Sequence, residues 1–330
     1  FEEVAYLILN GELPTKKQLK DFEKKEKKER KLSKTLLQDI KNFPKKAHPM
    51  DVARTAVSIM GLEDIETKDN SPKANMRKVM RIFAKTPVAL AAFYRSRKGK
   101  KIISPKNNLS FSENFFYMCF GKVPNEDIVK AFDVSLILYA EHSFNVSTFT
   151  ARTITSSLSD IHGAITGAIA SLKGPLHGGA NEEVMHMMNK IKKPENALKW
   201  INKALDNKDV VMGFGHRVYK SGDSRVPTMR EYFSKVAKIK KDKKFEKIYD
   251  IVEKVMIDRK NIHPNVDYPT GPTYHLMGFD TDFFTPIFVI SRITGWSAHV
   301  IEQLSTNKLI RPLAAYNGSK HRHVSELKNR

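Results

Sequence analysis

Apolar residues recur along most of the chain at steps of three and four, the spacing that places them on one face of a helix. No alternating apolar–polar run longer than a few residues stands out. The ranges that carry the helical pattern are 52–60, 75–94, 126–138, 150–172, 182–191, 196–205, 228–237, 245–259 and 284–304. The pattern predicts an all-α fold.

Two lysine-rich runs, 16–46 and 235–247, also hold apolar residues at helical spacing. They predict amphipathic helices with a basic face in solvent. The net charge of +21 favours polyanionic partners, yet no nucleic-acid-binding motif accompanies it. We therefore interpret the lysines as surface residues and expect no nucleic acid partner. A basic helical protein that binds nucleic acid or a membrane remains the rival hypothesis, and it predicts salt-sensitive binding.

The 330 residues are 41% hydrophobic, enough for a large buried core. No apolar run approaches the roughly 20 residues of a membrane span, and we see no secretory signal. The single cysteine, Cys119, stands among aromatic neighbours and is interpreted as a core thiol. We therefore expect a cytoplasmic protein that does not bind membranes.

The loops between the predicted helices hold the glycines, the prolines and several histidines and arginines. The loop 174–181 places His177 between glycines, where a helix is expected to start near Asn181. Glycines let a ligand approach the backbone, and a helix start favours a neutral imidazole that donates a hydrogen bond to developing negative charge. The plainer alternative is a turn histidine without a role.

A second loop, 211–220, contains Gly213 and Gly215, followed by His216 and Lys220. The third glycine of a dinucleotide fingerprint is absent and no strand precedes the loop, which argues against a Rossmann site. Backbone N–H groups and nearby cations indicate instead a platform for phosphate and an acyl carrier.

Two further charged residues stand in contrasting surroundings. Asp267 lies in the stretch 263–278, which we predict to be a loop because it is rich in proline and glycine; by itself it indicates a turn or a cap. Arg292 lies inside the apolar helix 284–304, and a buried guanidinium needs an anionic partner in the protein or a ligand. The histidines lack companion ligands at metal-site spacing, so we expect no metal.

These loops follow one another as they do in the citrate synthase family, which the chain resembles essentially end to end. The matching stretches are 138–145, 174–181, 213–219, 265–267, 284–288, 291–299 and 309–312. The resemblance implies an all-α homodimer with a large helical domain, residues 1–180 and 284–330. A small domain, residues 181–283, would close over the active site.

The resemblance also implies roles for individual residues. A thioester α-proton is weakly acidic, so a base removes it only if the enolate is stabilised as it forms. Asp267 would be the base, His177 the donor to the thioester oxygen and His216 the donor to the oxaloacetate ketone. The implied oxaloacetate ligands are His142, Arg225, Arg292 and, across the dimer, Arg311, while Arg30 and Ser147 lie near positions that contact substrate or shape the site. The implied CoA-binding residues are Val211, Met212, Gly213, Phe214, Gly215 and Lys220. Acyl-CoA is a co-substrate, and no cofactor is required.

The stretch 284–296 and the stretch 307–312 resemble 2-methylcitrate synthases, family members that use propionyl-CoA. The His177 loop is shared with ordinary citrate synthases, which use acetyl-CoA. One methylene in a pocket is worth only about 1–3 kcal/mol. We therefore expect a 2-methylcitrate synthase that also has citrate synthase activity, with citrate synthase proper as the alternative. An inactive family member is disfavoured because His177, His216 and Asp267 are all present.

Overall fold

The computed structural model describes residues 1–219 and 221–330. Across these residues the chain is helical, without a strand, and one isolated bridge joins Phe214 and Pro264. The helices are α1 (Glu2–Asn10), α2 (Lys16–Glu29), α3 (Lys34–Asn42), α4 (Pro49–Glu63), α5 (Pro72–Ser96), α6 (Phe111–Phe120), α7 (Glu126–Tyr139), α8 (Val146–Ser156), α9 (Ile161–Leu172), α10 (Ala180–Ile191), α11 (Pro194–Asp206), α12 (Val226–Lys240), α13 (Lys244–Lys260), α14 (Asp267–Met277) and α15 (Phe284–Ser305). Short 3-10 helices lie at Thr281–Phe283, just before α15, and at Leu327–Asn329. The predicted all-α fold is confirmed.

The lysine-rich runs form amphipathic helices, as predicted. In α2, Phe22 and Glu26 are buried while most of the lysines are exposed, and α3 buries Leu36 and Ile40. Thr15 begins α2 with a capping box in which its side chain and that of Gln18 each accept a backbone N–H. Within the described part of the chain, no helix is long and apolar enough to cross a bilayer.

The prediction of one continuous helix over 150–172 is wrong, because α8 ends at Ser156 and α9 begins at Ile161. Leu158 adopts a left-handed conformation, with φ of 65°, which a helix does not accommodate. Asp160 then caps α9 by accepting a hydrogen bond from the Gly163 N–H at 2.9 Å. The apolar spacing runs across this break and hides it.

The prediction of a loop over 263–278 is also wrong from Asp267 onward, where α14 starts. Pro269 falls in the first turn, where proline is tolerated, and Pro272 lies inside the helix. Residues 268–274 are all buried, so the helix has no polar face to produce a periodic pattern. The helix α6 lacks a polar face for a similar reason and was not predicted.

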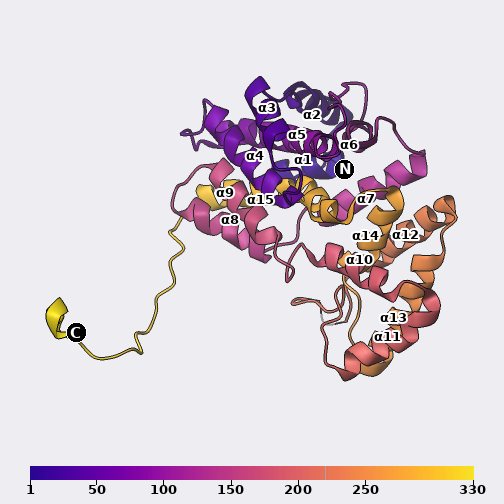
Figure 1. The fold of residues 1–330 in the computed structure, drawn as a ribbon. Coiled ribbons are helices and arrows are strands. Elements are labelled where there is room, and N and C mark those ends of the chain that lie inside the picture. The colour runs from indigo at the N-terminus through magenta and orange to yellow at the C-terminus, as the bar shows by residue number, and fades with distance from the viewer. Residues whose placement is uncertain (220) are drawn as a thin grey trace.

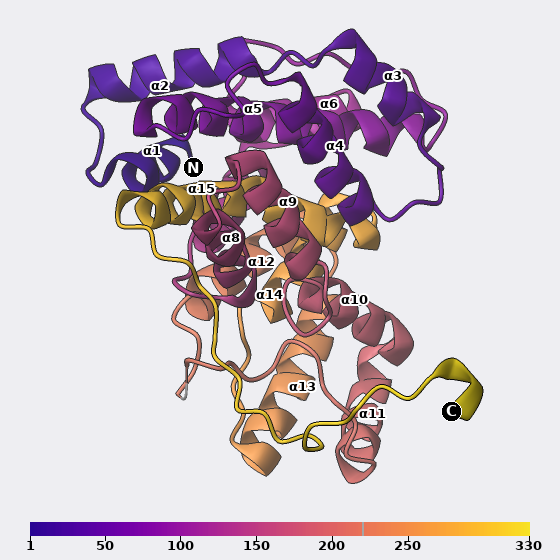
Figure 2. The same cartoon turned by 90° about the vertical axis from the view of Figure 1, so that its left-hand side faces the viewer.

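The helices α10–α14 gather on one side of the molecule, with α11 and α13 farthest from the N-terminal helices (Figures 1 and 2). The helix α15 lies among α4, α5, α7, α8 and α9 and makes up the centre of the other group. The proposed boundaries at residues 181 and 283 fall where the chain passes between the groups, and the division into two domains stays a prediction. Residues 311–330 are exposed and leave the body as an extended segment (Figure 1).

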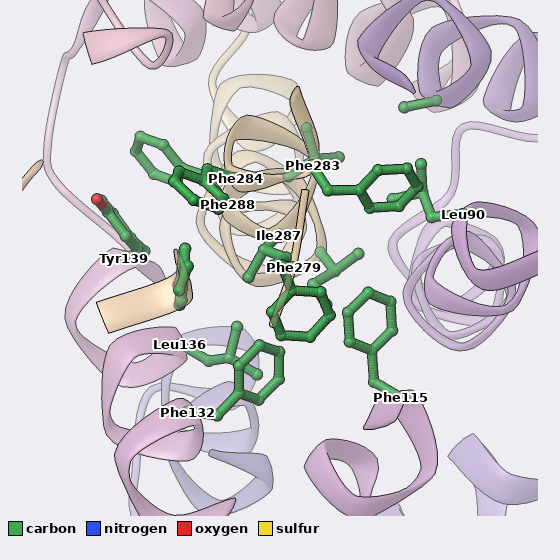
Figure 3. Packing of buried hydrophobic residues seen from close by; sticks show 14 of the residues in the cluster. Leu90, Phe115, Phe132, Leu136, Tyr139, Phe279, Phe283, Phe284, Ile287 and Phe288 are labelled. Carbon is green, nitrogen blue, oxygen red and sulfur yellow. The ribbon is translucent and has the colours of Figure 1, made fainter. Parts of the chain in front are cut away.

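A cluster of aromatic side chains, mostly from α6, α7, α15 and the segment before α15, packs in the core (Figure 3). The ring of Phe279 lies 5.0–5.8 Å from four other phenylalanine rings, among them Phe115 and Phe132. Tyr139 packs on Phe288 at 4.0 Å between ring centres, and its hydroxyl points away from the cluster (Figure 3). Cys119 is 2% exposed, and burial raises the pKa of its thiol, which fits the interpretation as a core thiol.

Candidate active site

The predicted loops converge on one cavity of about 510 Å³. It is lined by residues from the stretches 139–146, 175–180, 210–218 and 265–267, by Arg225, and by Phe288 and Arg292 of α15. The predicted site residues that line it are His142, His177, Val211, Met212, Gly213, Phe214, Gly215, His216, Arg225, Asp267 and Arg292. Residues from six sequence regions therefore share one chamber, which a set of unrelated loop residues would not do.

Asp267 is the first residue of α14, and among the described residues its carboxylate is the one that lines the cavity. Burial raises the pKa of Asp267 to about 6, although the Tyr139 hydroxyl, which donates to its Oδ1 at 2.5 Å, and the Arg225 cation both lower it. Its backbone N–H donates to Asn265 Oδ1 at 3.1 Å, which fixes the start of the helix. The carboxylate is ionised at neutral pH yet basic enough to accept a proton.

His177 lies in the turn before α10, and the backbone of Ser147 determines its tautomer. The Ser147 N–H donates to His177 Nε2 at 3.2 Å, so Nε2 is an acceptor and the ring proton is on Nδ1. Burial, with help from the Arg292 cation, lowers the pKa of His177 to about 4. The ring is therefore a neutral donor above that pH, as the sequence predicted, although burial is the main cause. Ser147 shapes the site by orienting this ring.

His216 has the opposite tautomer. Its Nδ1 accepts the backbone N–H groups of Val218 and Tyr219 at 3.0 and 3.2 Å, which leaves the proton on Nε2. Burial and the Arg225 cation lower the pKa of His216. His142 Nε2 lies 3.1 Å from the Tyr219 hydroxyl. Burial, together with the Arg225 and Arg292 cations, lowers the pKa of His142 to about 4.

Two arginines supply positive charge to the cavity. Arg225 pairs through Nε and Nη2 with both oxygens of the buried Asp223, at 2.9 and 2.7 Å. Burial opposes its charge, but Asp223 raises the Arg225 pKa above its ordinary value. Arg292 is 1% exposed, and its Nε donates to the Tyr139 carbonyl at 2.6 Å, while Nη1 has no hydrogen-bond partner among the residues that the structure describes. Burial and the Arg225 cation lower the Arg292 pKa to about 9. This unpaired cation is what an anionic ligand requires.

The glycine loop 211–215 is tied to the segment that precedes Asp267. Backbone hydrogen bonds run from Gly215 N–H to the His263 carbonyl and from Asn265 N–H to the Gly213 carbonyl, both at 2.9 Å. Gly213 has φ of 86°, and a Cβ atom there would come within 2.6 Å of a Val184 methyl group. Only glycine fits this position. The two backbone hydrogen bonds hold the glycine loop against the segment that leads into the Asp267 helix.

Three of the predicted binding residues, Arg30, Ser147 and Arg311, do not line the cavity. Arg30 is buried elsewhere, where it pairs with Glu26 and donates to the carbonyls of Lys106 and Leu109. Arg30 therefore has no contact with the cavity in this structure, and the role implied for it, to contact substrate or to shape the site, stays a prediction. Arg311 is exposed at the start of the extended C-terminal segment, away from the cavity of its own chain. Lys220 lies outside the described residues.

Sequence reasoning missed three residues that hold the site together. Tyr139 bonds Asp267 through its hydroxyl and Arg292 through its carbonyl, Asp223 holds Arg225, and Tyr219 contacts His142. Each stands within three residues of a predicted site residue, and that adjacency was the available signal. Among the residues that the structure describes, no group of three or more histidine, cysteine or acidic side chains is arranged to hold a metal ion.

Comparisons with known proteins identify the family of the chain. A family model described as "Citrate synthase, C-terminal domain" matches residues 1–313. The 2-methylcitrate synthase 2 of Corynebacterium glutamicum is 53% identical over 100% of this chain and 88% of its own length. The citrate synthase of Mycolicibacterium smegmatis is 49% identical over 98% of this chain and 86% of its own.

Solved structures show the same architecture. The citrate synthase of the archaeon Thermoplasma acidophilum, in a ternary complex with carboxymethyl coenzyme A and oxaloacetate, aligns with a TM-score of 0.93 at 32% identity and covers 100% of this chain and 88% of that one. The citrate synthase of Thermotoga maritima aligns with a TM-score of 0.90 at 37% identity and the same coverage of both chains. The chain belongs to the citrate synthase family.

Proposed function

We propose that this chain joins the α-carbon of an acyl-CoA to the ketone of oxaloacetate and then hydrolyses the thioester, releasing CoA. The observation that carries the proposal is the set of three proton-transfer groups in one cavity. A carboxylate of raised pKa, Asp267, shares the chamber with a histidine protonated on Nδ1, His177, and one protonated on Nε2, His216. Each is in the protonation state that the reaction needs.

In the first step Asp267 takes a proton from the acyl α-carbon. The electron pair of that C–H bond moves onto the thioester oxygen, where the His177 Nδ1–H donates a hydrogen bond to the developing charge. This stabilisation is needed because the carbon acid is much weaker than a carboxylic acid. The backbone of residues 211–215 lines the same cavity and is proposed, with Lys220, to bind CoA.

In the second step the nucleophilic carbon attacks the oxaloacetate ketone, and His216 Nε2 donates its proton to the forming alkoxide. Arg225 and Arg292 are proposed to bind the two carboxylates of oxaloacetate, because guanidinium groups bind carboxylates with two parallel hydrogen bonds. His142 adds a further hydrogen bond. Water then cleaves the thioester and yields free CoA and a tricarboxylate. This hydrolysis drives the overall reaction forward. These side chains accomplish the steps without a cofactor.

We propose propionyl-CoA as the preferred acyl donor, with acetyl-CoA also accepted. Relatives of 53% and 49% identity are named 2-methylcitrate synthases, and another of 49% is named a citrate synthase. A pocket gains only about 1–3 kcal/mol from one methylene, so the kcat/KM values for propionyl-CoA and acetyl-CoA are expected to differ by about 10- to 200-fold. Citrate synthase proper is the second candidate.

The first test is a thiol-release assay with oxaloacetate and each acyl-CoA. We expect CoA release only with oxaloacetate present, and a higher kcat/KM for propionyl-CoA than for acetyl-CoA. A higher value for acetyl-CoA would favour citrate synthase proper. Release of no thiol from either donor by the folded protein would contradict the proposal and revive the basic binding hypothesis, which a salt-dependent nucleic acid titration would then test.

We also propose that the chain acts as a cytoplasmic homodimer. Leu309, Leu313 and Tyr316 are exposed on the extended C-terminal segment, where a second copy would cover them. Arg311 lies on the same segment and is proposed to reach the partner's oxaloacetate. The buried thiol of Cys119 fits a reducing compartment.

The Tyr139 hydroxyl provides a prediction about pH. Its hydrogen bond stabilises the carboxylate and lowers the Asp267 pKa, so Tyr139→Phe is expected to raise that pKa above about 6. The acid limb of kcat/KM should move to higher pH by about one unit, which corresponds to about 1.4 kcal/mol and matches a hydrogen bond to a charged group. A profile from pH 5 to 9 checks this. An unmoved limb would assign it to another group.

A further inference from the structure

A buried carboxylate outside the cavity joins three helix starts. Glu182, in the first turn of α10, is 9% exposed. Its Oε2 lies 3.2 Å from His48 Nε2, and its Oε1 accepts hydrogen bonds from the Thr285 hydroxyl and from the Thr285 N–H at 3.3 Å. His48 is at the start of α4 and Thr285 is in the first turn of α15. None of the three residues lines the cavity.

Each of these hydrogen bonds has a defined direction. His48 caps α4, since its Nδ1 accepts the Met50 N–H at 3.2 Å. The ring proton is therefore on Nε2, which donates to Glu182. The Thr285 N–H belongs to the first turn of α15 and has no partner within that helix. A carboxylate at the positive ends of helices is also favoured by their dipoles. Glu182 thus serves as an acceptor for two helices other than its own.

Glu182 lies between the turn that holds His177 and the helix that holds Arg292. The turn that holds His177 runs directly into α10, and its backbone is tight, with the His177 N–H bonded to the Gly174 carbonyl at 2.9 Å. A Cβ atom on Gly179 would lie 3.0 Å from the Lys173 carbonyl oxygen, so the turn has little room to adjust. On the other side, α15 continues from Thr285 to Arg292, two turns further along.

We propose that Glu182 is a positioning residue that, through His48 and Thr285, holds the start of α10 and hence His177 in register with α4 and α15. The inference rests on the proposed function, in which His177 Nδ1 must meet the thioester oxygen while Asp267 removes the proton. A displacement of about 1 Å in such a group costs on the order of 10²-fold in rate. Glu182 acts through His177 and touches no substrate.

The test is Glu182→Gln, which keeps the shape of the side chain. A glutamine offers one acceptor and one NH₂ group, so either orientation leaves His48 or the Thr285 N–H facing a donor. We expect kcat to fall about 10- to 100-fold, while the oxaloacetate dissociation constant from calorimetry stays within about threefold, because that substrate is proposed to bind His216, Arg225 and Arg292. Wild-type kcat in a folded Glu182→Gln variant would overturn the inference and leave the proposed function standing.

Two comparisons separate positioning from simple loss of stability. Thr285→Ser keeps the hydroxyl donor and should keep kcat, whereas Thr285→Val, of similar volume, should lower it; equal losses would overturn the inference. In the second, Glu182→Gln is combined with His177→Ala. A residue that acts through His177 adds no further loss of kcat to that of His177→Ala, and multiplied losses would contradict the proposal. A wild-type chain that releases no thiol would overturn the proposed function and this inference with it.

Discussion

Replacing Asp267 by asparagine is expected to lower kcat by about 10²- to 10⁴-fold, the range that general acid–base catalysis contributes. Asparagine has the same shape and its Oδ1 still accepts the Tyr139 hydroxyl, so the start of α14 should persist. What disappears is the group that takes the α-proton. The thiol-release assay with both acyl-CoAs measures the loss.

The pH dependence provides a second measurement of the same group. Burial raises the Asp267 pKa to about 6, and a carboxylate acts as a base only above its pKa, so wild-type activity should fall about tenfold per unit as pH drops below 6. His142 and His177, with pKa values of about 4, are neutral through that range and do not produce the limb. The residual activity of Asp267→Asn should lack the limb.

Oxaloacetate binding is the control for this variant. Asparagine removes a negative charge beside the proposed site of a dianion, so the dissociation constant should be unchanged or lower. A loss of kcat below tenfold, or an acid limb that persists in the variant, would assign the base to another residue. A large loss of oxaloacetate binding would indicate that Asp267 helps to build the site.

The sequence predicted the all-α fold and most of the candidate site because both produce regular local signals. Helices with one polar face show the 3.6-residue period, and His177 and His216 stand in glycine-containing loops. The other site residues were predicted from the resemblance to the citrate synthase family. The fold was harder to predict where the signal is absent. The buried helix α14 has no polar face, and the break at Leu158 does not interrupt the apolar spacing. In α14 tertiary burial decided the structure, whereas the break lies at an exposed residue, Leu158.

Hydrogen-bond partners could not be predicted from the sequence, although they determine the chemistry. His177 and His216 each stand beside glycine, yet opposite ring nitrogens carry the proton, because different backbone N–H groups meet each ring. For Arg30 the information that the sequence did not provide was its pairing partner. Arg30 is placed near a family position for substrate, but a pair with Glu26 four residues earlier on the same helix directs it into the core. Such pairings depend on how distant segments pack.

Replacing Arg292 by methionine is expected to raise the stability of the fold while it weakens the binding of oxaloacetate. The guanidinium is 1% exposed with Nη1 unpaired, and burial and Arg225 lower its pKa to about 9, so folding opposes a charge that is still present at pH 7. The free-energy cost of burying the charged guanidinium is therefore fully present below pH 9, and it declines as the pH rises through 9 and the folded protein loses that charge. Methionine fills a similar space without the charge. The melting temperature at pH 7 should rise.

The same substitution should raise the KM for oxaloacetate by about 30- to 5,000-fold, because removing one partner of a buried charge-assisted pair costs about 2–5 kcal/mol. Arg292→Lys is the matched control: it keeps the charge but loses the planar fork, so KM should be intermediate and the melting temperature should not rise. A methionine variant that is less stable and binds oxaloacetate normally would show that Arg292 serves the core through its bond to the Tyr139 carbonyl. Higher stability with lost binding would show that the buried charge is retained for the substrate, at the expense of the fold.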